Sequence, residues 1–541
     1  MRGFPISRRS ALAGMAAIPA ATLPGVARAG AIPSNWSALA GAYRVPDWFR
    51  DAKFGIWAHW SAQCVPEQGD WYGRLMYLQG HPMYEHHVKT YGHPSETGFM
   101  EIENRWKAEA WDPEYLVRRY KAAGARYFMS LGAHHDNLDC FDSSHHAWNT
   151  LRVGPKRDIV GTWERIVRGE GLRFGVSNHI SHAWHWWQTA YGYDPEGPLA
   201  GVRYDAWRLR KEDGRGTWWE GLDPQELYTG ATMAPPPGIT SIEAMNAWHD
   251  THSGRWMEFA PPGNLAFVAK WLLRSNEIVD RYRPDIIYMD DYGLPFGPVG
   301  VEALAHYYSR ALERGGDIDV VLTAKVLSAF QREALVEDVE RGWSDRLRDQ
   351  PWQTCTCIGD WHYNRSRFLN KSYVPAKQVI QRLCDVVAKN GNLLLSIPMR
   401  GDGTIDAEEE KILDGITAWM ALNGEASIHG SRPWRIYGDG PTQVQAGMHT
   451  EGDTFFTPQD VRFTVKDGAL HVAVLEWPDS PVRITALGEG QLPSARIERA
   501  RLNDGRDVRF RRSGDALELT IPPARDGDMI PVVRLDGRGL I

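Results

Sequence analysis

Most of the chain alternates between short apolar runs and longer amphipathic segments. The apolar runs have the composition and length of buried strands, and they cover residues 53–60, 125–132, 173–178, 286–289, 320–325, 352–358 and 392–397. Helical patterns lie between them, at 114–125, 162–169, 265–282, 301–314 and 376–390. Strands that alternate with helices predict a parallel sheet. Seven strands, or eight if 334–342 is counted, favour a (β/α)8-like TIM barrel over about 35–432.

The pattern changes after a last helix predicted at 407–422. From residue 433 to 541, short stretches alternate between apolar and polar positions and are separated by turn residues. Val461–Val465 and Leu470–Val474 flank Asp467-Gly468, a dipeptide typical of a two-residue hairpin. We therefore predict an antiparallel β-sandwich for 433–541. It contains no catalytic group of residues, which favours a scaffold packed on the barrel over a separate sugar-binding module.

The first 29 residues have the pattern of a targeting segment. Paired arginines, Arg8 and Arg9, precede an Ala-rich apolar stretch, and Ala27-Arg28-Ala29 is a small-x-small cleavage site. This arrangement is typical of a bacterial twin-arginine signal peptide, so we expect a periplasmic or secreted protein. The apolar stretch is too short to span a membrane, and no other stretch is long enough, so no membrane partner is expected.

A long connection near 187–262 interrupts the alternation. It is rich in tryptophan and contains Pro235-Pro236-Pro237; the tryptophans are Trp207, Trp218, Trp219, Trp248 and Trp256. Long connections between a strand and its helix lie at the active-site end of a barrel. Two interpretations stay open: the insertion forms a wall of the pocket, or it is a surface loop held by aromatic contacts.

Composition narrows the class of ligand. The net charge of −7 and the pI of about 6.3 give no basic surface for nucleic acid. Five cysteines are too few, and odd in number, for a disulfide framework. The chain has 24 tryptophans, and flat aromatic rings suit the stacking of sugars, although many of them must pack in the core.

Polar side chains follow the predicted strands at their carboxyl ends, where barrel enzymes place catalytic groups. They are His59, His134, His135, His179, Asp290, Lys325 and Glu340. Imidazoles with few cations and no phosphate-binding loop suit a neutral polyol, and two carboxyl groups can flank a glycosidic bond. Spacing alone does not choose the pair, because other acids compete: Asp136, Asp142, Asp291, Glu337, Asp338 and Asp360.

Four further histidines, His81, His86, His87 and His93, suggest a metal only weakly. No HExxH or comparable ligand spacing is present, so we expect surface or sugar-contacting histidines, no metal and no cofactor.

Several motifs together resemble the α-L-fucosidases of glycoside hydrolase family 29. They are KFGIWAHW at 53–60, GDWY at 69–72, the run from Trp111 to Asn149, PKRDIVG at 155–161, RPDIIYMDD at 283–291, VAKNGNLLLSIPMRGDGTI at 387–405 and LNGEASIHGSRPW at 422–434. The resemblance covers about 40–435. It implies a barrel with a β-sandwich, and an exo-acting enzyme that removes terminal α-L-fucose from fucosylated glycans with retention of configuration.

The resemblance also implies roles for residues. Asp290 matches the nucleophile, although a shift of one position would match its neighbour Asp291 instead. Glu340 matches the acid/base, with Glu337 as runner-up. Fucose-binding positions are matched by His59, Trp71, His134 and His135. Lys325 falls near an arginine of many relatives. An apolar pocket for the methyl group of fucose could come from Trp57, Trp71, Trp352 or Phe141.

Two departures from the family pattern bear on the sugar. Ser177-Asn178-His179 stands where many relatives have Tyr-Tyr-Ser, and Trp352-Gln353 where many have Trp-Glu. We therefore keep an α-L-galactosidase, or another L-sugar glycosidase, as the alternative, and a non-catalytic sugar-binding protein as a distant one. The sequence does not determine the linkage or the oligomeric state.

Overall fold

The computed structural model describes residues 31–254, 264–452 and 454–541. The predicted signal segment, 1–29, lies outside these ranges, as does Trp256 of the insertion. Within the described ranges, eight parallel strands form a closed barrel in sequence order. They are β1 (Phe54–Ala58), β2 (Tyr127–Ala133), β3 (Arg173–Asn178), β4 (Ile286–Tyr292), β5 (Val321–Lys325), β6 (Val336–Asp338), β7 (Trp352–Cys357) and β8 (Gly391–Ser396). The barrel prediction is confirmed. The 334–342 segment contains β6, which completes the set of eight strands.

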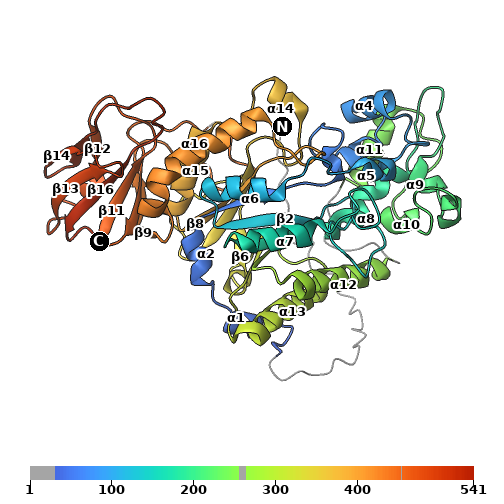
Figure 1. Ribbon diagram of the computed structural model, residues 1–541, viewed down its shortest axis with the longest axis horizontal. Helices are drawn as coiled ribbons and strands as arrows, with labels where there is room; N and C mark the ends of the chain where they lie inside the picture. The colour runs from blue at the N-terminus through green and yellow to red at the C-terminus, as the bar shows by residue number, and fades with distance from the viewer. Residues whose placement is uncertain (1–30, 255–263, 453) are drawn as a thin grey trace, which may run out of the picture.

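Long helices connect most of the strands and cover the outside of the barrel (Figure 1). They are α6 (Pro113–Ala122), α7 (Ile159–Gly169), α12 (Leu265–Tyr282), α13 (Pro298–Gly315) and α15 (Ala376–Ala388), with α16 (Ala407–Asn423) after β8. Local sequence fixes the start of α6. The Asp112 carboxylate caps the helix by accepting from the Tyr115 N–H at 2.9 Å, and Pro113 takes the first helical position. Beside β6, the short η5 (Gln331–Glu333) stands where a covering helix would lie.

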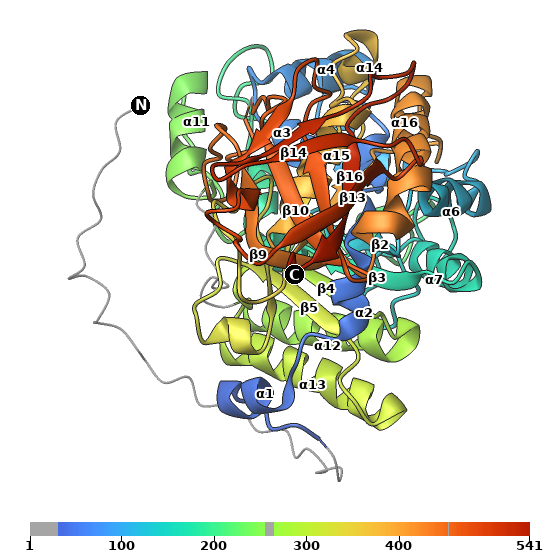
Figure 2. The same cartoon turned by 90° about the vertical axis from the view of Figure 1, so that its left-hand side faces the viewer.

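The C-terminal strands form two antiparallel sheets that face a shared apolar core (Figure 2). One sheet has the order β13-β16-β11-β10-β9 and the other β12-β15-β14. Their bounds are β9 (Arg432–Asp439), β10 (Val461–Lys466), β11 (Ala469–Val474), β12 (Val482–Ile484), β13 (Arg496–Leu502), β14 (Arg509–Arg512), β15 (Leu517–Thr520) and β16 (Val532–Arg538). The predicted hairpin is confirmed: Asp467 and Gly468, both with positive φ, join β10 to β11. The division at residue 433 stays a prediction, one residue after β9 begins.

A buried ion cluster fixes these sheets to the barrel. Asp385 of α15 is fully buried, and its carboxylate lies 2.6 Å from the Arg462 guanidinium of β10 and 2.7 Å from the Lys389 ammonium. Burial by itself raises the pKa of Asp385, but Arg462 and Lys389 hold it below its usual value. A charge buried without such partners is strongly destabilising, so the cluster holds the two regions in one arrangement.

Shorter helices occupy the connections after β1 and β3, and they gather at one end of the molecule (Figure 1). The β1–β2 connection carries α3 (Tyr72–Leu75), α4 (Pro82–Thr90) and α5 (Phe99–Arg105), and the β3–β4 connection carries α8 (Ala183–Trp186), α9 (Asp205–Arg208), α10 (Pro224–Leu227) and α11 (Ile242–Thr251). Other short helices are α1 (Trp36–Ala42), α2 (Asp47–Ala52) and α14 (Arg365–Leu369). No helix in the described part of the chain is long and apolar enough to span a membrane.

Candidate active site

A cavity of about 280 Å³ opens at the carboxyl ends of the barrel strands. Polar side chains from the ends of β1 to β6 reach it, as expected for a parallel barrel. The lining residues are Trp57, His59, Trp71, His134, His135, His179, His182, Tyr288, Asp290, Tyr292, Lys325, Glu340, Trp361 and His449. Eight of the nine predicted site residues lie in this set, and Trp352 is the exception.

Asp290 is the anionic centre of the cavity. Its Oδ1 lies 2.5 Å from the Lys325 ammonium, and its Oδ2 lies 3.2 Å from His179 Nδ1 and 3.4 Å from His135 Nε2. Burial raises the pKa of Asp290, but the Lys325 charge and His179 outweigh it and hold the pKa well below its usual range. The carboxylate is therefore ionised near neutral pH, as a nucleophile must be.

Asp291 faces away from the cavity. Successive residues of a strand point to opposite sides, so the two adjacent acids have different surroundings. Ser181 Oγ donates to both Asp291 oxygens at 2.8 and 2.9 Å, and His182 Nε2 lies 3.3 Å from Oδ1. Asp291 is 1% exposed and does not line the cavity. The register of β4 thus selects Asp290 of the pair.

Four buried imidazoles surround Asp290 and are neutral near pH 7. Burial lowers the pKa of His59, His134 and His135 well below the usual range, and lowers that of His179. The His179 carbonyl accepts from His135 Nδ1 at 2.9 Å, which fixes the tautomer of His135. A neutral imidazole both donates and accepts, so this ring of histidines suits the hydroxyl groups of an uncharged sugar.

Among the described residues, His134, His135 and His179 form the one group compact enough to consider for a metal. Their ligand atoms lie within 4.8 Å of one another. One ring nitrogen of His135 is already held by a carbonyl, and His179 Nδ1 faces Asp290. The prediction of no metal stays a prediction, and insensitivity of the activity to chelators would test it.

Lys325 joins the two candidate catalytic acids. Its ammonium contacts Glu340 Oε2 as well as Asp290 Oδ1. Burial by itself lowers the pKa of Lys325, but Asp290 and Glu340 raise it well above the usual value. Lys325 ends β5 and Glu340 lies two residues after β6, so consecutive strands bring these groups together.

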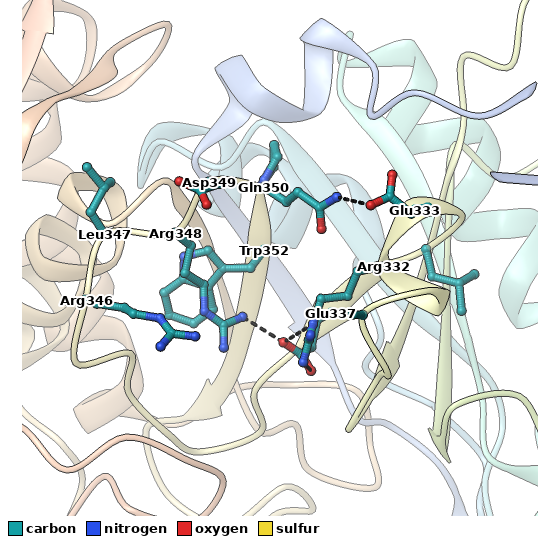
Figure 3. A pocket seen from close by; sticks show the side chains of 12 residues that line it. Arg332, Glu333, Glu337, Arg346, Leu347, Arg348, Asp349, Gln350 and Trp352 are labelled. Carbon is teal, nitrogen blue, oxygen red and sulfur yellow. Dashed lines mark hydrogen bonds and ion pairs between the residues drawn. The ribbon is translucent and has the colours of Figure 1, made fainter. Parts of the chain in front are cut away.

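Glu337 lies outside the cavity. It belongs to β6 and points away from the barrel axis, where Arg332 Nη2 and Arg348 Nη1 each lie 2.9 Å from its carboxylate (Figure 3). Its Oε1 also accepts from the Leu327 N–H at 3.1 Å. These contacts describe a structural ion cluster, so the position of Glu337 does not suit an acid/base for Asp290.

The prediction for Trp352 needs a correction. This side chain begins β7 and lines a separate cavity with Arg348, whose guanidinium lies 4.8 Å from the ring centre (Figure 3). Its indole N–H donates to the Lys389 carbonyl. A residue at the start of a parallel strand lies at the opposite end from the catalytic groups. Phe141, suggested for the methyl pocket, packs instead against Tyr282 in the core.

The GDWY segment shapes one wall. The Asp70 carboxylate accepts from the backbone N–H groups of Trp361 and His362 at 3.1 and 2.8 Å, which ties this segment to the loop after β7. Trp71 has a left-handed backbone (φ +68°), uncommon for such a residue and typical of functional sites. Trp57, Trp71 and Trp361 give the cavity its apolar surfaces.

Sequence reasoning missed Trp361, His182, Tyr292, Tyr288 and His449. The strand-end rule could have found Trp361, which follows the predicted strand at 352–358, and Tyr292, which ends β4. His449 lies between β9 and β10, outside the predicted barrel, and no sequence pattern marked it.

The chain is similar to known proteins over most of its length. The model of the family "Alpha-L-fucosidase" matches residues 25–425. The tissue alpha-L-fucosidase of Rattus norvegicus is 24% identical over 465 residues, covering 83% of each chain, and the plasma alpha-L-fucosidase of Homo sapiens is 24% identical over 82% of this chain and 79% of its own. The crystal structure of Thermotoga maritima alpha-fucosidase in complex with fucose is 23% identical with a TM-score of 0.64, over 93% of this chain and all of that one.

Proposed function

Since the chain belongs to the alpha-L-fucosidase family, we propose that it is an exo-acting, retaining α-L-fucosidase that removes terminal fucose from glycans. The observation that carries the proposal is an ionised Asp290, in contact with Lys325 and beside His135 and His179, in a cavity lined by neutral imidazoles and tryptophans. This combination supplies a nucleophile, hydroxyl-binding groups and an apolar surface in one site.

In the proposed reaction, Asp290 attacks the anomeric carbon while Glu340 gives a proton to the departing oxygen. Glu340 then takes a proton from the water that releases fucose from Asp290. Both carboxylates contact the same Lys325 nitrogen, so their nearest oxygens are no more than about 5 Å apart, a separation that suits a retaining pair. An inverting pair needs room for a water between the acids and lies farther apart.

The contact between Lys325 and Glu340 adds a requirement. In the first step Glu340 must give a proton to the departing oxygen, but in the structure the Lys325 ammonium contacts Oε2 of this carboxyl group. We infer that bound substrate separates Lys325 from Glu340 and leaves the ammonium on Asp290. The low pKa that Lys325 gives to Asp290 then favours its departure in the second step.

Sugar recognition follows from the lining. His59, His134 and His135 offer donors and acceptors to the sugar hydroxyls, and the ring faces of Trp71 and Trp361 offer apolar contact to the C–H face and the methyl group. A cavity of about 280 Å³ is small for an extended glycan, which supports action on a terminal residue.

The test is release of 4-nitrophenol from 4-nitrophenyl α-L-fucoside, with the α-L-galactoside as comparison. L-Galactose adds one hydroxyl at the methyl group of fucose, so we expect the fucoside to be the better substrate. In Asp290→Asn the rate should fall by several orders of magnitude, because the amide is a poor nucleophile. Faster release from the galactoside would shift the proposal to that sugar, and full activity of Asp290→Asn would contradict the assigned nucleophile.

We also propose twin-arginine export with cleavage after Ala29. The pattern of residues 1–29 supports it. Replacing both arginines, Arg8→Lys with Arg9→Lys, should retain the protein in the cytoplasm with its first 29 residues attached. Periplasmic recovery of that variant, cut after residue 29, would contradict this route.

A further inference from the structure

The loop that carries Glu340 is bonded to the connection between β9 and β10. The His449 N–H donates to the Glu340 carbonyl at 2.9 Å, and the Glu451 N–H donates to the Arg341 carbonyl at 3.0 Å. Farther along, the Gly447 N–H donates to the Trp343 carbonyl at 3.1 Å. Three backbone hydrogen bonds therefore hold residues 447–451 against residues 340–343.

Side chains reinforce this contact. The mostly buried Glu451 carboxylate contacts Arg341 at 2.6 Å and the Arg382 guanidinium, and it accepts from Thr356 Oγ1 at 2.7 Å. Gly342 allows the backbones to approach, because a Cβ at this position would lie 1.9 Å from the Gly447 carbonyl oxygen. The β9–β10 connection is therefore built onto the Glu340 loop.

The result is a side chain from outside the barrel at the mouth of the cavity. The His449 imidazole is exposed and lines the cavity together with Glu340. Tyr292, which is 56% exposed, lines the same mouth and pairs in register with Lys325. His449 and Tyr292 thus line the cavity together with Glu340 and Lys325.

We propose that His449 and Tyr292 form the subsite for the leaving group, and that this group is a second, uncharged sugar residue. The proposal rests on the function proposed above, because it takes Glu340 as the donor of the proton to the departing oxygen. A phenol ring stacks on the C–H face of a pyranose, and an imidazole hydrogen-bonds its hydroxyls. The C-terminal region would then select the sugar from which fucose is removed.

The experiment compares two substrates that share fucose and differ in the leaving group. α-L-Fucosyl fluoride releases a single atom and needs no leaving-group subsite, whereas a disaccharide with fucose α-linked to galactose fills it. The variant His449→Gly removes the imidazole and suits the positive φ of +53° at this position. We expect the ratio of disaccharide to fluoride kcat/KM to fall about tenfold, mainly through KM.

His145→Gly is the matched control. His145 is also exposed, lies in the connection after β2 and does not line the cavity. It should leave the ratio of the two kcat/KM values unchanged. Tyr292→Ala, a second variant at the subsite, should lower the ratio in the same way as His449→Gly, and the Tm of each variant shows whether it folds.

An equal loss on both substrates in folded His449→Gly and Tyr292→Ala would overturn the proposal, because the residues would then support the fucose site itself. An unchanged ratio in both variants would also overturn it. If the wild type cleaves the fluoride but not the disaccharide, a second sugar is the wrong leaving group. Failure of the wild type on both substrates would instead contradict the proposed function.

Discussion

The long connection after β3 and the connection between β9 and β10 meet the barrel in different ways. The first has many tryptophans and lies where active-site loops are expected, yet none of its described residues from 187 to 254 lines the cavity. The second belongs to the C-terminal sheets, yet it supplies His449. Length and aromatic content therefore did not predict which segment reaches the site.

The contacts of the two segments explain the difference. The insertion binds the β1–β2 connection through buried carboxylates: Asp205 accepts from Tyr77 at 2.9 Å, and Asp194 accepts from Tyr84 at 2.6 Å. These contacts hold the insertion beside α4 and α5, at the right in Figure 1. The β9–β10 connection bonds directly to the backbone beside Glu340. The interpretation of the insertion as a wall of the pocket is not supported for its described part.

The largest effect should come from the acid that the β9–β10 connection supports. In Glu340→Gln we expect kcat/KM for the disaccharide to fall by about 10² to 10⁴, and less for the 4-nitrophenyl glycoside, whose leaving group needs little protonation. Steady-state kinetics on both substrates measures this. Glu337→Gln is the control and should lower the Tm while changing kcat/KM little, because it weakens the Arg332–Arg348 cluster. A large loss of kcat/KM in Glu337→Gln with little loss in Glu340→Gln would contradict Glu340 as the proton donor. The β9–β10 connection would then not support the acid.

A smaller effect should follow from loosening the connection itself. Glu451→Gln keeps the shape of the side chain but removes the charge between Arg341 and Arg382. We expect the Tm to fall by about 2–4 °C, and the disaccharide kcat/KM to fall more than that for the fluoride. Calorimetry and the same pair of substrates measure these changes. A lower Tm with an unchanged ratio of the two kcat/KM values would mean that the connection is structural only.

This effect should depend on pH. Burial raises the pKa of Glu451, but Arg382, Thr356 and Arg341 outweigh it and hold the pKa below its usual value of 4.5. A carboxylate with a depressed pKa stabilises the fold above the unfolded pKa, and this contribution is lost as the pH falls through the folded pKa. The Tm difference between wild type and Glu451→Gln should therefore be full at pH 7 and shrink below about pH 4.5. A difference that grows on acidification would contradict the assigned ion cluster.

The smallest effect is expected in the insertion. Trp207 is 40% exposed, and the Arg203 guanidinium lies over its ring, 4.4 Å from the ring centre. Trp207→Ala should change kcat/KM for the fluoride and the disaccharide by less than about twofold, because the side chain lies away from the cavity. Kinetics on the two substrates checks this, with His449→Gly run beside it. A loss of kcat/KM on the disaccharide alone would indicate that the insertion contacts the leaving group after all.

The sequence by itself determined the barrel, because a buried parallel strand needs a continuous apolar run and its helix needs a polar face. It also predicted the Asp467-Gly468 hairpin and a ring of polar side chains at strand ends. These features depend on neighbours along the chain. Strand ends of a parallel barrel meet at one edge, so order in sequence was enough to gather His59, His134, His179 and Asp290.

The family resemblance favoured Asp290 over Asp291 and Glu340 over Glu337, but only the tertiary structure gave the physical difference within each pair, since Asp290 and Glu340 line the cavity and Asp291 and Glu337 do not. Asp290 and Asp291 face opposite sides of β4, and a shift of one residue would reverse them. Glu337 belongs to β6, whereas Glu340 lies in the loop after it. The structure also moved Trp352 away from the site and brought His449 to it. Glu340 and His449 are more than a hundred residues apart in sequence, and their contact exists because Asp385, Arg462 and Glu451 bind the C-terminal sheets to the barrel. No local pattern records an interaction of that range.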